Sequence, residues 1–269
     1  MKLNHIIQRL ESDYPKSLAE DWDNPGLQTG HWEQDIHKVY VALDASDEVL
    51  EHCVDWKADL LITHHPLLIS GIKQINDRDL HGRKILKMAE NHLSHFAMHT
   101  NYDVAKMGRL CSDYLKMTDL EILEITGTDT SLTDGDKKQT IPVGIGTAGT
   151  LPECMTLREC CEYVKQAFSL NSVQVFGSLD SKVSRAALCP GSGKSLIPLA
   201  LAKKADVYIT GDVGHHDGLD AAEQGMAVID AGHYGLEHVF IPQMEQYLKT
   251  VFPELEIGTE PIRAPFEVL

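Results

Sequence analysis

Residues 59–65 read DLLITHH, an apolar run of strand length that ends in two histidines. The helix-period segment DEVLEHCVDW (47–56) precedes this run, and HGRKILKMAENH (81–92) follows it. Short apolar segments, KVYVALDAS (38–46) and SHFAMHT (94–100), flank the two helices in turn. Strands of roughly four to seven residues that alternate with helices of about ten to fifteen are typical of the α/β class with a largely parallel sheet.

The same alternation resumes after a polar, turn-rich stretch, EITGTDTSLTDGDKKQT (124–140), which we interpret as the mid-chain break. We therefore expect a first α/β half at residues 1–125, with the C-terminal helix packing back on it, and a second half at 126–269. One intertwined unit is the alternative. The closing helix is expected to run through HYGLEHVFIPQMEQYLKTVF (233–252).

The two halves share a short similarity. Residues 58–65 (ADLLITHH) match 205–212 (ADVYITGD), and each leads through a helix to a second strand, at 95–103 and 227–237. Both second strands end in a histidine that an acid follows four residues later. A true duplication predicts two related halves that face each other, with strand ends from both meeting at one metal cleft. A chance match is the alternative.

Composition excludes several classes of protein. The chain has 24 basic and 40 acidic residues, a formal charge of −16, which argues against nucleic acid as a partner. The N-terminus lacks the apolar core of a secretion signal, and no apolar run approaches the roughly 20 residues that cross a bilayer. The six cysteines form no CxxC pair, so we expect reduced thiols in a soluble, cytoplasmic protein without a membrane partner.

Two histidines and a proline follow the apolar residues of the 59–65 strand. Adjacent side chains of a strand point to opposite faces, but the backbone bends at a strand end, and Pro66 restricts His65 to an extended conformation. His64 and His65 can therefore aim at neighbouring points, as ligands of one metal centre would. The alternative is that one imidazole packs in the core and the other is solvated.

Three more candidate ligands follow strands later in the chain. Asp103 is either a metal ligand or the N-cap of a helix that we expect to begin near Val104. His233 and Glu237 are four residues apart, so a helix would place both on one face, with Glu237 as a bridge between ions; a solvated face is the alternative. Three imidazoles and two carboxylates exceed the needs of one tetrahedral ion. They predict two divalent ions, of zinc, iron or manganese, about 3.5–4 Å apart.

Residues 189–195 read CPGSGKS, which ends like a phosphate-binding Walker A loop. The Walker pattern requires a glycine where this chain has Leu188, so ATP hydrolysis through this loop is not expected. Gly191, Ser192 and Gly193 can still form a β–α turn whose backbone N–H groups contact an anionic substrate. A plain tight turn is the alternative.

Six motifs resemble, in order, those of the GTP cyclohydrolase 1 type 2 homologues, also known as the Ngg-interacting-factor-three family of dinuclear-metal proteins. The motifs are WDNPGLQ (22–28), ITHHPL (62–67), HTNYD (99–103), PGSGKS (190–195), TGDVGHHD (210–217) and AGHYGLE (231–237). They span almost the whole chain. The short distance from Asp103 to the strand at Ile141 resembles the short form of the family, without the domain that larger members insert between the halves.

The resemblance assigns roles to particular residues. The family's metal ligands fall on the five that the local patterns favour, which are His64, His65, Asp103, His233 and Glu237. The resemblance places His99 beside the metals as an acid or base. It places His215 and His216 in the pocket as substrate contacts, with metal ligation or solvation on a helix face as alternatives. It also implies a homohexamer built from dimers, in which residues 257–269 form a terminal strand or a contact between subunits.

We therefore expect a metal-dependent hydrolase that acts on a nucleotide or a related small molecule. Two ions would activate a water molecule at neutral pH, and we expect His99 to carry a proton, because a free imidazole titrates near neutrality. The family name implies opening of the GTP imidazole ring, and a broader nucleotide hydrolase fits the same residues. The alternative is a non-catalytic metal-binding or protein-interaction scaffold.

Overall fold

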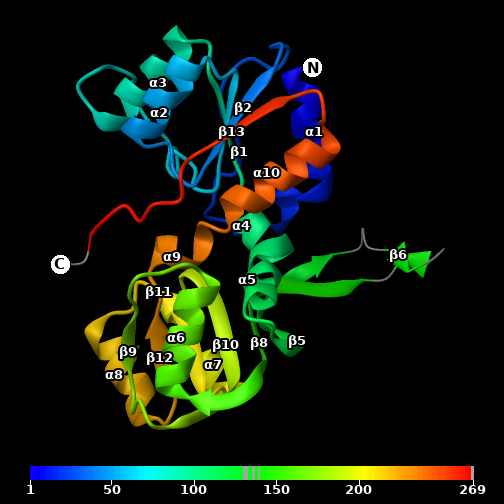
Figure 1. The fold of residues 1–269 in the computed structure, drawn as a ribbon. Coiled ribbons are helices and arrows are strands. Elements are labelled where there is room, and N and C mark those ends of the chain that lie inside the picture. The colour runs from blue at the N-terminus through cyan, green and yellow to red at the C-terminus, as the bar shows by residue number, and fades with distance from the viewer. Residues whose placement is uncertain (130–132, 135–136, 139, 268–269) are drawn as a thin grey trace. The chain divides into compact units, whose positions relative to one another are not determined.

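The computed structural model describes residues 1–129, 133–134, 137–138 and 140–267, and its fold is of the α/β class with two main sheets (Figure 1). The chain divides into two compact units, Met1–Tyr102 with Phe240–Ile262 and Asp103–Val239 with Arg263–Leu269. The chain thus passes into the second unit at Asp103, whereas the sequence placed the boundary near residue 125. No helix in the described ranges is long and apolar enough to cross a bilayer.

The first unit contains a five-stranded sheet in the order β1-β4-β3-β2-β13. Its strands are β1 (Gly26–Thr29), β2 (Lys38–Ala42), β3 (Leu60–Thr63), β4 (Ser94–Ala97) and β13 (Glu256–Thr259). All neighbours are parallel except β1, which pairs antiparallel with β4. Figure 1 shows α2 (Asp47–Trp56) and α3 (Leu80–Glu90) on one face, and α1 (Leu3–Asp13) and α10 (Phe240–Val251) on the other.

Helices on both faces explain the uninterrupted apolar strands of the first unit. Leu60, Leu61 and Ile62 of β3 are all fully buried, as a parallel sheet covered on two sides requires. α2 begins where the Ser46 hydroxyl accepts a hydrogen bond from the Val49 N–H at 3.1 Å. The terminal strand expected from the C-terminal segment is present as β13, although the sequence did not predict the short, half-buried β1.

The second unit contains a six-stranded sheet in the order β5-β8-β10-β11-β12-β9. Its strands are β5 (Thr118–Asp129), β8 (Ile141–Thr156), β9 (Gln174–Phe176), β10 (Lys182–Ser192), β11 (Val207–Gly211) and β12 (Ala227–Asp230). Its α-helices are α5 (Gly108–Tyr114), α6 (Leu157–Ala167), α7 (Ile197–Ala202), α8 (His215–Glu223) and α9 (His233–Glu237). Only the pairs β10–β11 and β11–β12 are parallel, so the expectation of a largely parallel sheet is correct for the first unit and wrong here.

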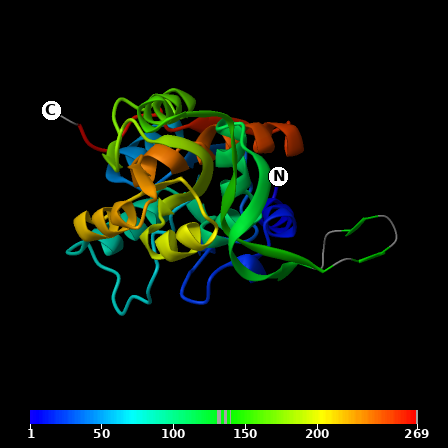
Figure 2. The ribbon, with the colours of Figure 1, turned by 90° about the horizontal axis from the view of Figure 1, so that it is seen from below.

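The predicted mid-chain break is a hairpin instead. β5 continues through Asp129 and pairs antiparallel with β8, and Figure 2 shows this hairpin extending away from the rest of its unit. β-Branched residues such as Ile125, Thr126 and Thr128 favour strand pairing despite the polar composition. The short strands β6 (Thr133–Asp134) and β7 (Lys137–Lys138) continue beyond it, and residues 130–132, 135–136 and 139 lie outside the described ranges.

Two predicted helices have different bounds. The helix expected from Val104 begins at Thr100, as α4 (Thr100–Tyr102), and continues through a π-helical segment, Asp103–Met107, into α5. Asp103 is therefore inside the helix and is not its N-cap. The closing helix is divided into α9 and α10. Pro242 explains this division, because it has no N–H to donate to the carbonyl of His238, four residues before it.

A duplicated β–α–β module is present in both units, in a different alignment from the one that the sequence suggested. β2, α2 and β3 correspond to β11, α8 and β12, and both pairs of strands are parallel. VYVALD at 39–44 then matches VYITGD at 207–212. The sequence had matched β3 with β11, which pairs the second strand of one module with the first strand of the other.

Candidate metal centre

Three histidines of the first unit form one cluster, which we call the first-unit cluster: His64, His65 and His99. His64 and His65 follow β3, and His99 follows its parallel neighbour β4, so the carboxyl ends of two strands bring the side chains together. One nitrogen from each imidazole lies within 4.8 Å of the others. His64 is fully buried, while His65 and His99 are partly exposed. The sequence had foreseen two ligands and a neighbouring acid or base at this point.

An oxygen atom orients each imidazole of the first-unit cluster. His64 Nδ1 lies 2.7 Å from the Met98 carbonyl, and His65 Nδ1 lies 2.9 Å from Asp44 Oδ1. His99 Nδ1 lies 2.8 Å from Asp23 Oδ1. A carbonyl and an ionised carboxylate only accept hydrogen bonds, so each Nδ1 carries the proton and each Nε2 is the nitrogen with a lone pair for an ion.

The carboxyl group of Asp23 stays ionised despite its burial. Burial alone would raise its pKa, but hydrogen bonds from His99 and Thr100 outweigh that effect and lower the pKa to about 2. Thr100 contributes its backbone N–H at 3.0 Å and its hydroxyl at 2.5 Å. Asp23 therefore remains a hydrogen-bond acceptor for His99 at every physiological pH.

Three residues of the second unit form a matching set, which we call the second-unit cluster: Asp103, His233 and Glu237. His233 and Glu237 lie one turn apart on α9, with His233 Nε2 at 2.9 Å from Glu237 Oε2. Two ligands of one ion at roughly 2.0–2.1 Å each are themselves about 3 Å apart, so this pair has the spacing of shared ligation. A carboxylate oxygen of Asp103 lies within 4.8 Å of one of Glu237.

The duplicated module orients one histidine in each cluster in the same way. His233 Nδ1 lies 2.8 Å from Asp212 Oδ2, and this pair has the same separation of 21 residues as Asp44 and His65. In both modules the aspartate follows the first strand and the histidine follows the second. These orienting roles of Asp44, Asp212 and Asp23 were not predicted from the sequence, although the repeated VY…D pattern and the WDNPGLQ motif contain the three residues.

Replacing Asp44 or Asp212 with alanine is expected to lower metal affinity about 10–100-fold, because the imidazole loses the acceptor that fixes its tautomer and direction. Titration of each purified variant with Zn²⁺ measures the effect. Asp47→Ala is the matched control, since Asp47 is a similarly exposed aspartate that pairs with Arg83 instead. Equal affinity in all three variants would contradict an orienting role.

Imidazoles and carboxylates form the donor set, and the neighbouring thiols are protonated. Burial is the main cause that raises the pKa of Cys111, and the charges of Glu237 and Asp103 raise it further. Burial likewise raises the pKa of Cys189. Oxygen and imidazole nitrogen donors suit divalent zinc, iron or manganese, so the two clusters fit a metal site.

Gly191 leaves room for the carboxylate of Glu237 because it has no Cβ atom. This glycine ends β10 with a left-handed φ of 69°, and a Cβ atom there would strike Glu237 Oε1 and come within 3.6 Å of His233 Nε2. A simple turn glycine would need only the positive φ, whereas this one also lies against the carboxylate. Gly191 therefore lies against the second-unit cluster, where a larger residue would displace the Glu237 carboxylate.

Gly191→Ala is expected to lower the free energy of unfolding by about 1–3 kcal/mol, from left-handed strain together with displacement of Glu237. It should also reduce bound metal. Gly225→Ala separates the two effects, because Gly225 has a φ of 90° but open space around its Cβ position. Denaturant unfolding and elemental analysis compare the variants. Unchanged metal content in Gly191→Ala would contradict the predicted role of Glu237 as a metal ligand.

The other predicted substrate contacts are in different settings. The Gly193 N–H donates to Thr210 Oγ1 at 3.1 Å, so this group is already engaged within the fold. Ser192 is exposed at the end of β10. His215 and His216 are exposed in the first turn of α8, with ring centroids 5.1 Å apart. Contact of these residues with a substrate stays a prediction.

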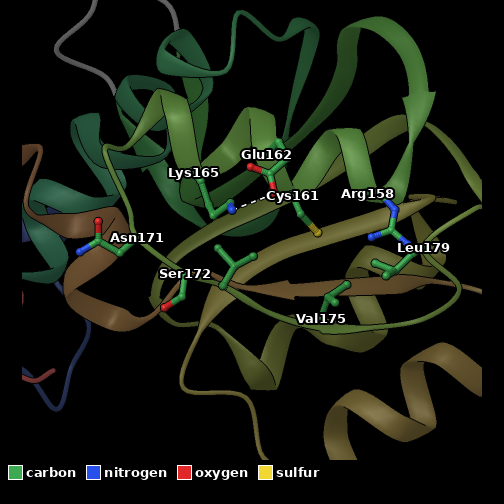
Figure 3. A pocket seen from close by; sticks show the side chains of 9 residues that line it. Arg158, Cys161, Glu162, Lys165, Asn171, Ser172, Val175 and Leu179 are labelled. Atoms are coloured by element: carbon green, nitrogen blue, oxygen red, sulfur yellow. Dashed lines mark ion pairs between the residues drawn. The ribbon is translucent and has the colours of Figure 1, made fainter. Parts of the chain in front are cut away.

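A pocket of about 240 Å³ lies elsewhere in the second unit, between α6 and the segment that leads into β9 (Figure 3). Arg158 and Lys165 line it, but Lys165 pairs with Glu162 at 2.8 Å. None of the predicted site residues belongs to this pocket.

Comparison with known proteins gives close matches over the whole chain. A GTP cyclohydrolase 1 type 2 homolog from Lactococcus lactis is 34% identical, over 93% of this chain and 92% of the relative. One from Clostridium perfringens is 32% identical over 100% of both chains. The alignment with a homolog from Halalkalibacterium halodurans extends over 351 residues, more than this chain contains, as expected for a short form without the insert.

Solved structures show the same fold. The crystal structure of a Bacillus cereus protein related to NIF3 has a TM-score of 0.88 and 25% identity, covering 100% of this chain and 99% of that one. Reduced HcgD from Methanocaldococcus jannaschii has a TM-score of 0.79 and 29% identity, covering 96% of this chain and 97% of that one. The model of the Duf34/NIF3 (NGG1p interacting factor 3) family matches residues 1–265, and the chain therefore belongs to that family.

Proposed function

We propose that this protein is a metal-dependent hydrolase that holds two divalent ions through residues of the first-unit and second-unit clusters. The substrate we propose is a nucleotide or a related small molecule. The observation that carries the proposal is the shared orientation of four imidazoles. His64, His65, His99 and His233 all have Nδ1 within hydrogen-bond distance of an oxygen acceptor. This arrangement makes Nε2 the nitrogen of each ring that would bind an ion or exchange a proton.

The proposed role of each residue follows from its hydrogen-bond or ion-pair partners. Ions bound by this donor set would lower the pKa of a shared water molecule and polarise the bond to be broken. His64, His65 and His233 would bind, and Asp103 and Glu237 would balance charge. His99 would move the proton, because Asp23 Oδ1 accepts a hydrogen bond from His99 Nδ1 and so makes Nε2 the nitrogen that exchanges a proton.

A small-molecule substrate is favoured by two properties of the chain. The relatives quoted above are named as homologs of a GTP cyclohydrolase, an enzyme class whose substrate is a nucleotide. The formal charge of −16 disfavours a long phosphate backbone, while bound cations would offset that charge locally for a single nucleotide. We also propose the homo-oligomer that the resemblance implies, which light scattering of the purified chain would measure.

The test combines metal removal with a single substitution. Chelation should abolish turnover of GTP or a related nucleotide, and Zn²⁺ or Mn²⁺ should restore it. His65→Ala should reduce bound metal per chain by elemental analysis, while the exposed-residue variant His31→Ala should retain it. Unchanged stoichiometry in His65→Ala would overturn the ligand assignment, and metal-loaded protein that turns over no nucleotide in a metabolite screen would overturn the activity.

A further inference from the structure

Trp22 presents an indole ring to solvent beside the proposed proton carrier. Its side chain is 60% exposed, and its ring centroid lies 5.7 Å from that of His99 at an interplanar angle of 79°. Burial of so large an apolar ring is ordinarily favourable, so an exposed indole at this position calls for a physical reason.

The segment that carries Trp22 is held in place by its polar neighbours. Asp23 is anchored by His99 and Thr100, as described above. Asn24 Nδ2 donates to the Leu68 carbonyl at 2.6 Å, and Gln28 Nε2 donates to the Asn24 carbonyl at 2.7 Å. These bonds tie the segment to the loops after β3 and β4, the same loops that position the first-unit cluster. The backbone that carries Trp22 is therefore held close to His99.

We propose that Trp22 is a stacking surface for a planar heteroaromatic ring of the substrate. This inference rests on the proposed function, and it specifies which part of the substrate meets the protein beside His99. A ring stacked on the indole would lie next to the imidazole that meets the indole edge-on. Asp21 and Asn24, which lie near Trp22 along its segment, are exposed polar residues.

If a base stacks on Trp22, removal of the indole should weaken nucleotide binding measurably. Trp22→Ala should weaken binding of guanosine 5′-monophosphate to the zinc-loaded chain about tenfold or more by calorimetry, and Trp22→Phe should keep most of the affinity. Ribose 5-phosphate, which has no base, should bind both proteins equally. Trp32→Ala is the matched control, because Trp32 is 51% exposed and its carbonyl accepts from the Asn4 N–H.

The outcomes separate this inference from the proposed function. Unchanged nucleotide affinity in Trp22→Ala, absence of nucleotide binding to the wild type, or an equal loss for ribose 5-phosphate would overturn the stacking role. A change in oligomeric state by light scattering would assign Trp22 to a protein contact and overturn it as well. Binding that depends on Trp22 without any turnover would support the stacking surface while the proposed hydrolase fails.

Discussion

Glu237→Ala is expected to remove at least one ion from each chain and to abolish turnover. Glu237 is 3% exposed, and its Oε2 lies 2.9 Å from His233 Nε2. A carboxylate oxygen of Glu237 lies within 4.8 Å of a carboxylate oxygen of Asp103. No solvent-exposed carboxylate can take the place of this buried one as a ligand. Loss of a residue that only orients a ligand costs about 10–100-fold in metal affinity. We expect the loss of Glu237, the predicted bridge between the ions, to cost at least about 100-fold. Zn²⁺ titration and elemental analysis measure both quantities.

Two further variants control for the fold. Glu237→Gln keeps the shape of the side chain while removing its charge, so it should fold normally and still bind metal weakly. Glu245→Ala removes a glutamate from a comparable pair four residues apart, with Lys249, on the surface of α10, and should change neither quantity. Full metal content in Glu237→Ala would exclude this residue as a ligand.

His99→Ala is expected to lower kcat by about 10²–10⁴-fold while leaving the number of bound ions unchanged, because a positioned proton carrier contributes about this much. This variant distinguishes a proton carrier from a metal ligand, because a ring nitrogen of His99 lies within 4.8 Å of one from His64 and one from His65. Loss of metal together with activity would make His99 a ligand, and the sequence-based role as acid or base would be wrong.

Much of the first unit was predictable because its strands are covered on both faces. Residues such as Leu60, Leu61 and Ile62 must all be apolar there, and a run of apolar residues that ends in His64 and His65 indicates a site at a strand end. The pair His233 and Glu237 was predictable for a different reason. A spacing of four residues places both side chains on one face wherever the helix forms, and α9 shows them in contact.

The parts that failed depend on tertiary pairing. The polar residues 124–129 form a strand only because β8 pairs with them, which no local pattern reveals. The start of the helix at Thr100 depends on Asp23, far away in the sequence, which accepts the Thr100 N–H. The orienting residues Asp44 and Asp212 were missed because their histidines follow 21 residues later, across a whole helix and a strand.

X-ray absorption spectroscopy of the zinc-loaded protein tests the central proposal most directly, namely that the protein holds a pair of ions through imidazole nitrogen and carboxylate oxygen. We predict nitrogen and oxygen ligands at about 2.0–2.2 Å with the signature of imidazole, and a metal–metal distance of about 3.5–4 Å. Sulfur ligands at about 2.3 Å, which Cys111 and Cys189 could supply, or a single isolated ion would contradict it.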